Sequence, residues 1–119
     1  MRRLPMDDSH MTFAEVRLIV KEQIKENPIL LYMKGTPQAP ECGFSQKVIQ
    51  ILNTYDKAYS FVNILENPDI RKDLPKVSDW PTFPQLYING ELLGGSDIVE
   101  VLHKSGELQE KINVVKKDE

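Results

Sequence analysis

Residues 29–45 read ILLYMKGTPQAPECGFS, a short apolar run followed by a proline-rich loop and by Cys42, the only cysteine of the chain. The run Ile29–Met33 is typical of a central strand that is covered on both faces of a sheet. The apolar residues after Cys42 have helical spacing, so its thiol is expected to meet the unpaired N–H groups and positive dipole end of a helix start. The stretch predicts a strand, a constrained loop and a thiolate-forming cysteine. The alternative is a buried cysteine that acts as a small hydrophobe.

Capping signals and apolar spacing on either side of this stretch predict the other helices and strands. Thr12 and Glu15 have the spacing of a capping box, and Asn89-Gly90 between two apolar stretches predicts a hairpin turn. Pro75 is expected to shorten or kink the helix that contains it. The predicted elements are a helix from Phe13 to about Asn27 with Phe13, Val16, Ile19, Val20 and Ile24 on its inward face, the strand Ile29–Met33, a helix over 43–55, a strand over 59–64, a short helix starting at Asn67-Pro68, a hairpin of 85–88 and 91–94, a helix from Ser96 and Asp97 to Gly106, and a last helix over 108–115.

Composition indicates one domain in a reducing compartment. The chain has 119 residues, which suffice for one hydrophobic core, and its single cysteine excludes an intramolecular disulfide, so a cytoplasmic protein is expected. The longest apolar run is far too short to span a membrane. Lys and Arg total 15 against 18 Asp and Glu and are dispersed, so no nucleic-acid partner is indicated. We expect a folded domain over 11–115, a disordered or cloning-derived tail over 1–10, and a charged tail over 116–119.

The element order α-β-α-β-α-β-β-α-α, with a redox-type thiol after the first strand, is typical of a thioredoxin-like domain. Within this class, the sequence resembles the monothiol glutaredoxins whose active site reads Cys-Gly-Phe-Ser. The resemblance implies an α/β, thioredoxin-like (glutaredoxin) fold with a four-stranded mixed sheet flanked by helices. It extends from about Phe13 to Leu108 and rests on five blocks in order: 33–37 (MKGTP), 42–45 (CGFS), 70–71 (IR), 80–87 (WPTFPQLY) and 90–98 (GELLGGSDI).

The resemblance implies a glutathione site around a catalytic Cys42. Lys34 would lie beside the thiol, favour the thiolate and meet a carboxylate of glutathione. Arg71 would bind the glycyl carboxylate through its planar guanidinium. From the residues alone, Lys34 is better interpreted as a solvated lysine at a strand end, and Arg71 could be one member of an i, i+4 surface pair.

The same resemblance assigns the other end of the site. A cis-proline at Pro84 would expose the backbone of Phe83 to pair with the cysteinyl unit of glutathione like an added strand. Backbone N–H groups at Ser96 would bind the γ-glutamyl carboxylate, and Asp97 would pair with its ammonium group. The alternative for Ser96 and Asp97 is plain N-capping, and both roles can hold together. Trp80 is expected to anchor a loop, Phe44 to lie partly exposed beside the thiol, and neither His10 nor His103 shows a ligand pattern.

The single cysteine also limits how the chain can hold iron. A [2Fe–2S] cluster ordinarily takes four thiolates, and this chain offers only Cys42. The family resemblance implies a cluster bridged between two subunits, with two glutathione thiolates completing the ligands. It also implies a BolA-like partner and transfer to apo iron–sulfur proteins. The competing function is reduction of protein–glutathione mixed disulfides by Cys42, which uses the same thiolate and the same pocket.

Overall fold

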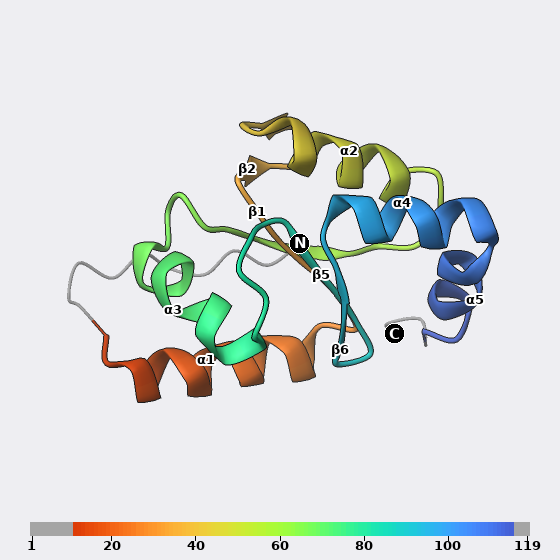
Figure 1. The fold of residues 1–119 in the computed structure, drawn as a ribbon. Coiled ribbons are helices and arrows are strands. Elements are labelled where there is room, and N and C mark those ends of the chain that lie inside the picture. Colours follow the sequence, from red (N-terminus) through yellow and green to blue (C-terminus); the bar gives the residue numbers. More distant parts are fainter. Residues whose placement is uncertain (1–10, 116–119) are drawn as a thin grey trace.

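The computed structural model describes residues 11–115, so the tails expected over 1–10 and 116–119 lie outside the described residues. Within 11–115 five helices surround a sheet (Figure 1). The elements are α1 (Phe13–Glu26), β1 (Ile29–Met33), β2 (Gly35–Thr36), β3 (Ala39–Pro40), α2 (Gly43–Leu52), β4 (Ser60–Asn63), α3 (Pro68–Ser78), β5 (Gln85–Ile88), β6 (Glu91–Gly94), α4 (Ser96–Ser105) and α5 (Glu107–Asn113). No helix in this part of the chain is long and apolar enough to cross a membrane.

The main sheet has four strands in the order β4-β1-β5-β6. The inner strand β1 pairs with β4 in parallel and with β5 in antiparallel, and β5 pairs with β6 through the Asn89-Gly90 turn. All five residues of β1 are buried, as expected for a strand with neighbours on both sides and helices on both faces. The predicted four-stranded mixed sheet flanked by helices, the arrangement of a thioredoxin-like domain, is therefore confirmed.

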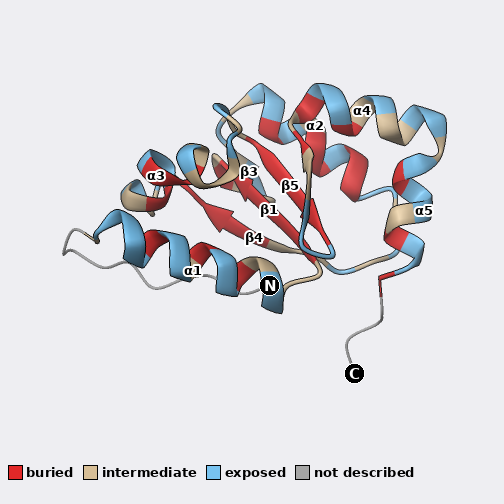
Figure 2. Cartoon of the chain, turned by 60° about the horizontal axis from the view of Figure 1, so that its bottom comes forward, coloured by how far each residue is buried: buried red, intermediate tan, exposed pale blue. Residues whose placement is uncertain are grey.

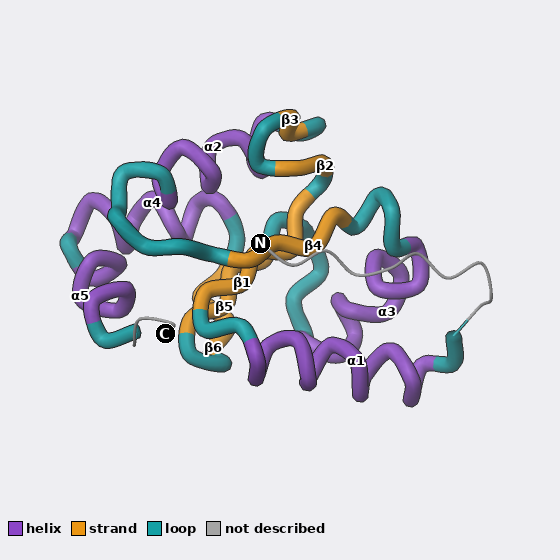
Figure 3. The backbone as a smooth tube through the Cα atoms, turned by 180° about the vertical axis from the view of Figure 1, so that it is seen from behind, coloured by secondary structure: helices purple, strands orange, loops and turns teal. Residues whose placement is uncertain are grey.

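The sheet separates two apolar cores, because successive side chains of a strand point to opposite faces. Leu31 of β1 belongs to the core under α2, α4 and α5, whereas Leu30 and Tyr32 belong to the core under α1 and α3. Seen from behind, the sheet runs between these two groups of helices (Figure 3). Colouring by burial shows β1, β4 and β5 largely buried and the outer faces of the helices exposed, whereas the edge strand β6 is mostly not buried (Figure 2).

The helix starts follow the sequence signals more closely than the faces and ends do. Thr12 and Glu15 form the predicted capping box, with the Glu15 N–H donating to Thr12 Oγ1 at 3.1 Å and the Thr12 N–H to Glu15 Oε1 at 2.9 Å. The placement of Phe13 on the inward face is wrong, since its side chain is 45% exposed. Phe13 is the first residue of α1, and the residues that are completely buried, Val16 and Val20, lie further along the helix.

The last helix, α5, ends at Asn113 instead of residue 115, and the ends of α2 and α3 differ from the prediction for local reasons. The helix α2 ends at Leu52 instead of residue 55, because the Thr54 and Tyr55 N–H groups donate to carbonyls three residues back and tighten the chain into a turn. The helix α3 continues past Pro75 to Ser78. Pro75 has no backbone N–H and therefore donates no helix hydrogen bond. Its carbonyl, however, accepts from the N–H of Asp79 and from the N–H of Trp80 at 3.2 Å, which closes the helix.

Candidate functional site

A cleft of about 660 Å³ opens beside the Cys42 thiol, between the start of α2, the side of α3, the loop before β5 and the start of α4. Its wall includes every residue that the sequence analysis singled out for the site: Lys34, Cys42, Arg71, Phe83, Ser96 and Asp97. These residues come from five separate segments of the chain. The fold therefore brings together side chains that lie up to 63 positions apart, from Lys34 to Asp97.

Cys42 is the N-cap residue of α2, with extended backbone angles (φ −153°, ψ 135°) and a half-exposed side chain. Burial against the cleft wall raises the pKa of its thiol, but four other influences together lower it below the ordinary value. These are the backbone N–H groups of Ser45 and Phe44, the charge of Lys34 and the hydroxyl of Ser45. A thiolate at a helix start beside a cation is a nucleophile and a metal ligand. The prediction of an activated thiol agrees with this arrangement.

Two buried polar residues that the sequence analysis did not single out fix the loop before Cys42. Ser45 is completely buried, and its Oγ accepts from the Lys34 N–H at 3.2 Å, which ties β1 to the first turn of α2. Asn63, at the end of β4, accepts from the Gly35 N–H at 2.9 Å. The short strands β2 and β3, in the segment predicted to be a loop, pair in an antiparallel ladder. The sequence gives no signal of the contacts of Ser45 and Asn63, because the partner of each side chain is a backbone N–H group.

Gly35 is required where β1 turns toward the cleft. Its φ of +92° is favourable only for glycine, and an added Cβ would lie 2.6 Å from the carbonyl oxygen of Ala39 and 2.8 Å from the nitrogen of Glu41. The Glu41 N–H donates to the Lys34 carbonyl at 3.0 Å across the same turn. The close approach of these backbones sets the path by which the chain reaches Cys42.

The cleft wall carries charges of both signs. Lys34 is half-buried and Arg71 is exposed on α3, and both cations line the wall. The start of α4 forms another part, where Ser96 is buried and Asp97 is exposed. Gly95 is the N-cap of this helix, and no side chain caps it, so the alternative in which Ser96 or Asp97 caps the helix is wrong. The first N–H groups of such a helix can bind an anion.

The remaining wall is the segment 80–84, which precedes β5. The Phe83–Pro84 peptide bond is cis, as expected for Pro84. Trp80 lies in this wall, and its indole nitrogen is buried without a hydrogen-bond partner among residues 11–115. The first residue of β5, Gln85, is completely buried and hydrogen-bonds to the backbone of this segment.

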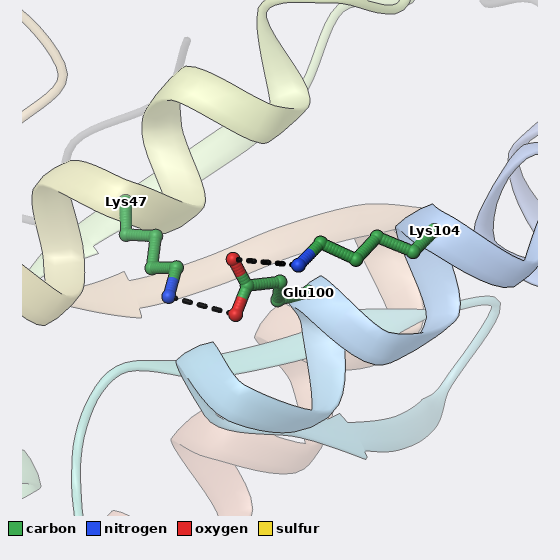
Figure 4. A network of polar contacts seen from close by, with 3 residues as sticks. All are labelled: Lys47, Glu100 and Lys104. Carbon is green, nitrogen blue, oxygen red and sulfur yellow. Dashed lines mark hydrogen bonds and ion pairs between the residues drawn. The ribbon is translucent and has the colours of Figure 1, made fainter.

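The two helices whose starts meet at the cleft are also joined along their exposed sides. Glu100 of α4 accepts from Lys47 of α2 at 2.8 Å and pairs with Lys104 at 3.7 Å. Each lysine contacts a different oxygen of the Glu100 carboxylate (Figure 4). The hydrogen bond from Lys47 is the main reason that the pKa of Glu100 lies below its ordinary value. The contact links α2 to α4 at the surface, above the buried core that packs them.

Within residues 11–115 no group of three or more His, Cys, Asp or Glu side chains could hold a metal ion. His103 instead makes a 2.6 Å hydrogen bond between its Nδ1 and the hydroxyl of Tyr55, and the other histidine, His10, lies outside the described residues. Cys42 is the cysteine of the described part of the chain, so any iron–sulfur cluster bound here would need further ligands from other molecules.

Comparison with known proteins gives a consistent result. The glutaredoxin family model matches residues 29–93. Glutaredoxin 4 of Buchnera aphidicola from Acyrthosiphon pisum is 55% identical over 98 residues, which cover 82% of this chain and 91% of that protein. Glutaredoxin 4 of Escherichia coli K12 is 55% identical over 93 residues, covering 78% of this chain and 81% of that protein.

The fold is also similar to solved structures. The solution structure of reduced poplar apo GrxS14 superposes with a TM-score of 0.75 at 45% identity, covering 87% of this chain and 95% of that one. A crystal structure of a buckwheat glutaredoxin–glutathione complex has a TM-score of 0.75 at 19% identity, covering 85% of this chain and 90% of that one, which shows the fold alone.

Proposed function

Since this chain belongs to the glutaredoxin family, we propose that it is a monothiol glutaredoxin that binds glutathione beside Cys42 and carries a [2Fe–2S] cluster shared with a second protein molecule. The observation that carries the proposal is that Cys42, two cations and the start of α4, which no side chain caps, line the same cleft. Glutathione has two carboxylates, one ammonium group and one thiol. The charges and the thiol of the cleft match that set.

Each part of the ligand has a chemically suitable group in the wall. Arg71 would bind the glycyl carboxylate, and Lys34 would meet a carboxylate of glutathione, through charge-assisted hydrogen bonds. The first N–H groups of α4, from Ser96 onward, would bind the γ-glutamyl carboxylate, and Asp97 would pair with the ammonium group. The backbone of Phe83 would pair with the cysteinyl unit like an added strand. Bound in this way, glutathione would present its thiol near that of Cys42.

The cluster is the cargo in this proposal. A [2Fe–2S] cluster ordinarily takes four thiolates. Cys42 of two chains would supply two, and two bound glutathione molecules would supply the others. A site held half by small molecules and half by two proteins can be passed to a recipient by ligand exchange. We therefore propose a homodimer bridged by the cluster, a BolA-like protein as an alternative partner, and apo iron–sulfur proteins as recipients.

The lowered pKa of Cys42 also supports a second candidate function, the reduction of protein–glutathione mixed disulfides. The Cys42 thiolate would attack the glutathione sulfur, forming a disulfide with glutathione and releasing the protein thiolate. A second glutathione thiolate would then attack this disulfide, releasing oxidised glutathione and restoring Cys42. The chain has no other cysteine to take that second step.

Anaerobic reconstitution with iron, sulfide and glutathione tests the carrier function. We expect a coloured species with the mass of a dimer that requires glutathione and is absent in Cys42→Ser. If no such species forms, the carrier proposal is wrong. A mixed-disulfide reduction assay on the same preparation tests the second function, and turnover like that of a dithiol glutaredoxin would favour it over cluster transfer.

A further inference from the structure

Gln85 makes an unusually complete set of hydrogen bonds for a buried side chain. Its Nε2 donates to the carbonyl oxygens of Trp80 at 3.0 Å and of Thr82 at 3.2 Å, while its Oε1 accepts from the Tyr87 hydroxyl at 2.9 Å. Both Gln85 and Tyr87 are buried, at 0% and 5% exposure. Only the NH₂ side of the amide can meet two carbonyl oxygens, so these contacts fix the orientation of the amide.

The two carbonyls that Gln85 holds belong to the wall of the cleft. Trp80 and Thr82 line it on either side of Pro81, ahead of Phe83. The indole N–H of Trp80 has no partner among the described residues, so the ring is not fixed through its own donor. What holds Trp80 by hydrogen bonds is its backbone, through its N–H to the Pro75 carbonyl at 3.2 Å and its carbonyl to Gln85.

We infer that Gln85 is a positioning residue for this site. Gln85 holds the segment 80–84 in the conformation that shapes the cleft. The Tyr87 hydroxyl fixes the orientation of the Gln85 side-chain amide. Gln85 acts through the backbone of that segment, since it does not itself line the cleft. The role in ligand affinity rests on the proposed binding of glutathione. The ordering of the segment does not, and can be measured in the protein without any ligand.

The substitution Gln85→Glu tests the inference with almost no change of shape. Its ionised carboxylate has no donor and would face two carbonyl oxygens, which should displace the segment. A protonated carboxyl group can donate one O–H, so part of the contact should return as the pH falls. A residue that only fills space would show no such pH dependence. The matched control is Gln109→Glu, which makes the same change on the exposed side of α5.

Two measurements report on the segment. Trp80 is the only tryptophan of the chain, so acrylamide quenching of its fluorescence in the free protein measures how well the segment is ordered. For Gln85→Glu at pH 8 we expect a rise in the quenching constant of about twofold and a rise in the Kd for glutathione of about tenfold. Relative to the unsubstituted protein at each pH, both effects should shrink at pH 5.5. Values equal to the control at both pH values would overturn the inference.

Tyr87→Phe provides a second variant if Gln85→Glu does not fold. It removes only the hydroxyl that orients Gln85, and we expect a rise of about twofold to threefold in the Kd for glutathione, with increased quenching of Trp80. An unchanged Kd and unchanged quenching would also count against the inference. If the unsubstituted protein itself binds no glutathione, the proposed function fails, and the quenching data alone decide the role of Gln85.

Discussion

Replacing Ser45 by alanine should lower the stability of the fold and also disfavour the thiolate form of Cys42, because the Ser45 hydroxyl stabilises both. Ser45 is completely buried, its Oγ accepts from the Lys34 N–H at 3.2 Å, and it faces the Cys42 sulfur. Ser45→Ala leaves that N–H without its acceptor in a partly buried position. An unmade buried hydrogen bond costs about 1–3 kcal/mol. Since the 3.2 Å contact is long for a neutral hydrogen bond, we expect a loss near the lower end, about 1–2 kcal/mol.

The same substitution should raise the pKa of Cys42. Its thiol pKa is lowered in part by the Ser45 hydroxyl, so removing that group favours the protonated thiol. Less thiolate is then present at neutral pH, and the curve of alkylation rate against pH moves to higher pH. Urea unfolding measures the first effect and iodoacetamide alkylation measures the second. Ser105→Ala, which removes an exposed hydroxyl outside the cleft, is the control for the alkylation curve.

The two results are expected to occur together. If Ser45→Ala unfolds at the same free energy as the unsubstituted protein and its alkylation curve does not move, then Ser45 neither ties β1 to α2 nor stabilises the thiolate. A loss of stability with an unchanged curve would leave its structural role and refute its part in activating Cys42.

Three further substitutions test other contacts of the site. Lys34→Gln removes a positive charge that lowers the pKa of Cys42, so the alkylation curve should move to higher pH and the rate at pH 7 should fall. Gly35→Ala places a Cβ 2.6 Å from the Ala39 carbonyl oxygen at a φ of +92°, and urea unfolding should show a loss of at least about 2 kcal/mol. Glu100→Gln should change stability little at any pH, because its exposed contacts with lysines are screened by solvent. The lowered pKa of Glu100 means that any contribution is present at neutral pH and lost on acidification, which unfolding at pH 7 and pH 3 would show.

Local signals predicted the elements that depend on neighbouring residues. The Asn89-Gly90 turn and the capping box of Thr12 and Glu15 each depend on residues within a few positions, and both are present. The continuous apolar run of β1 correctly indicated a strand covered on both faces. These features were predictable because the chain needs no distant partner to form them.

Contacts with distant or backbone partners were not predictable from local pattern. The hydrophobic pattern does not predict whether the polar residues Gln85 and Asn63 are buried or exposed. Both are buried, because their side chains hydrogen-bond to backbone groups of the loops around the cleft. The continuation of α3 beyond Pro75 depends on the hydrogen bonds that the Pro75 carbonyl accepts from the N–H groups of Asp79 and Trp80. For the site, the residues alone pointed to Cys42, whereas Lys34, Arg71 and the start of α4 were found through the family resemblance, since nothing local joins segments so far apart.

The stoichiometry of the reconstituted protein tests the central claim most directly. Native mass spectrometry of the coloured species should give two chains, one [2Fe–2S] cluster and two glutathione molecules, because each chain supplies one thiolate from Cys42 and a cluster takes four. The mass should fall to that of the single chain when glutathione is removed. A stable cluster bound without glutathione, or one that persists in Cys42→Ser, would contradict the account.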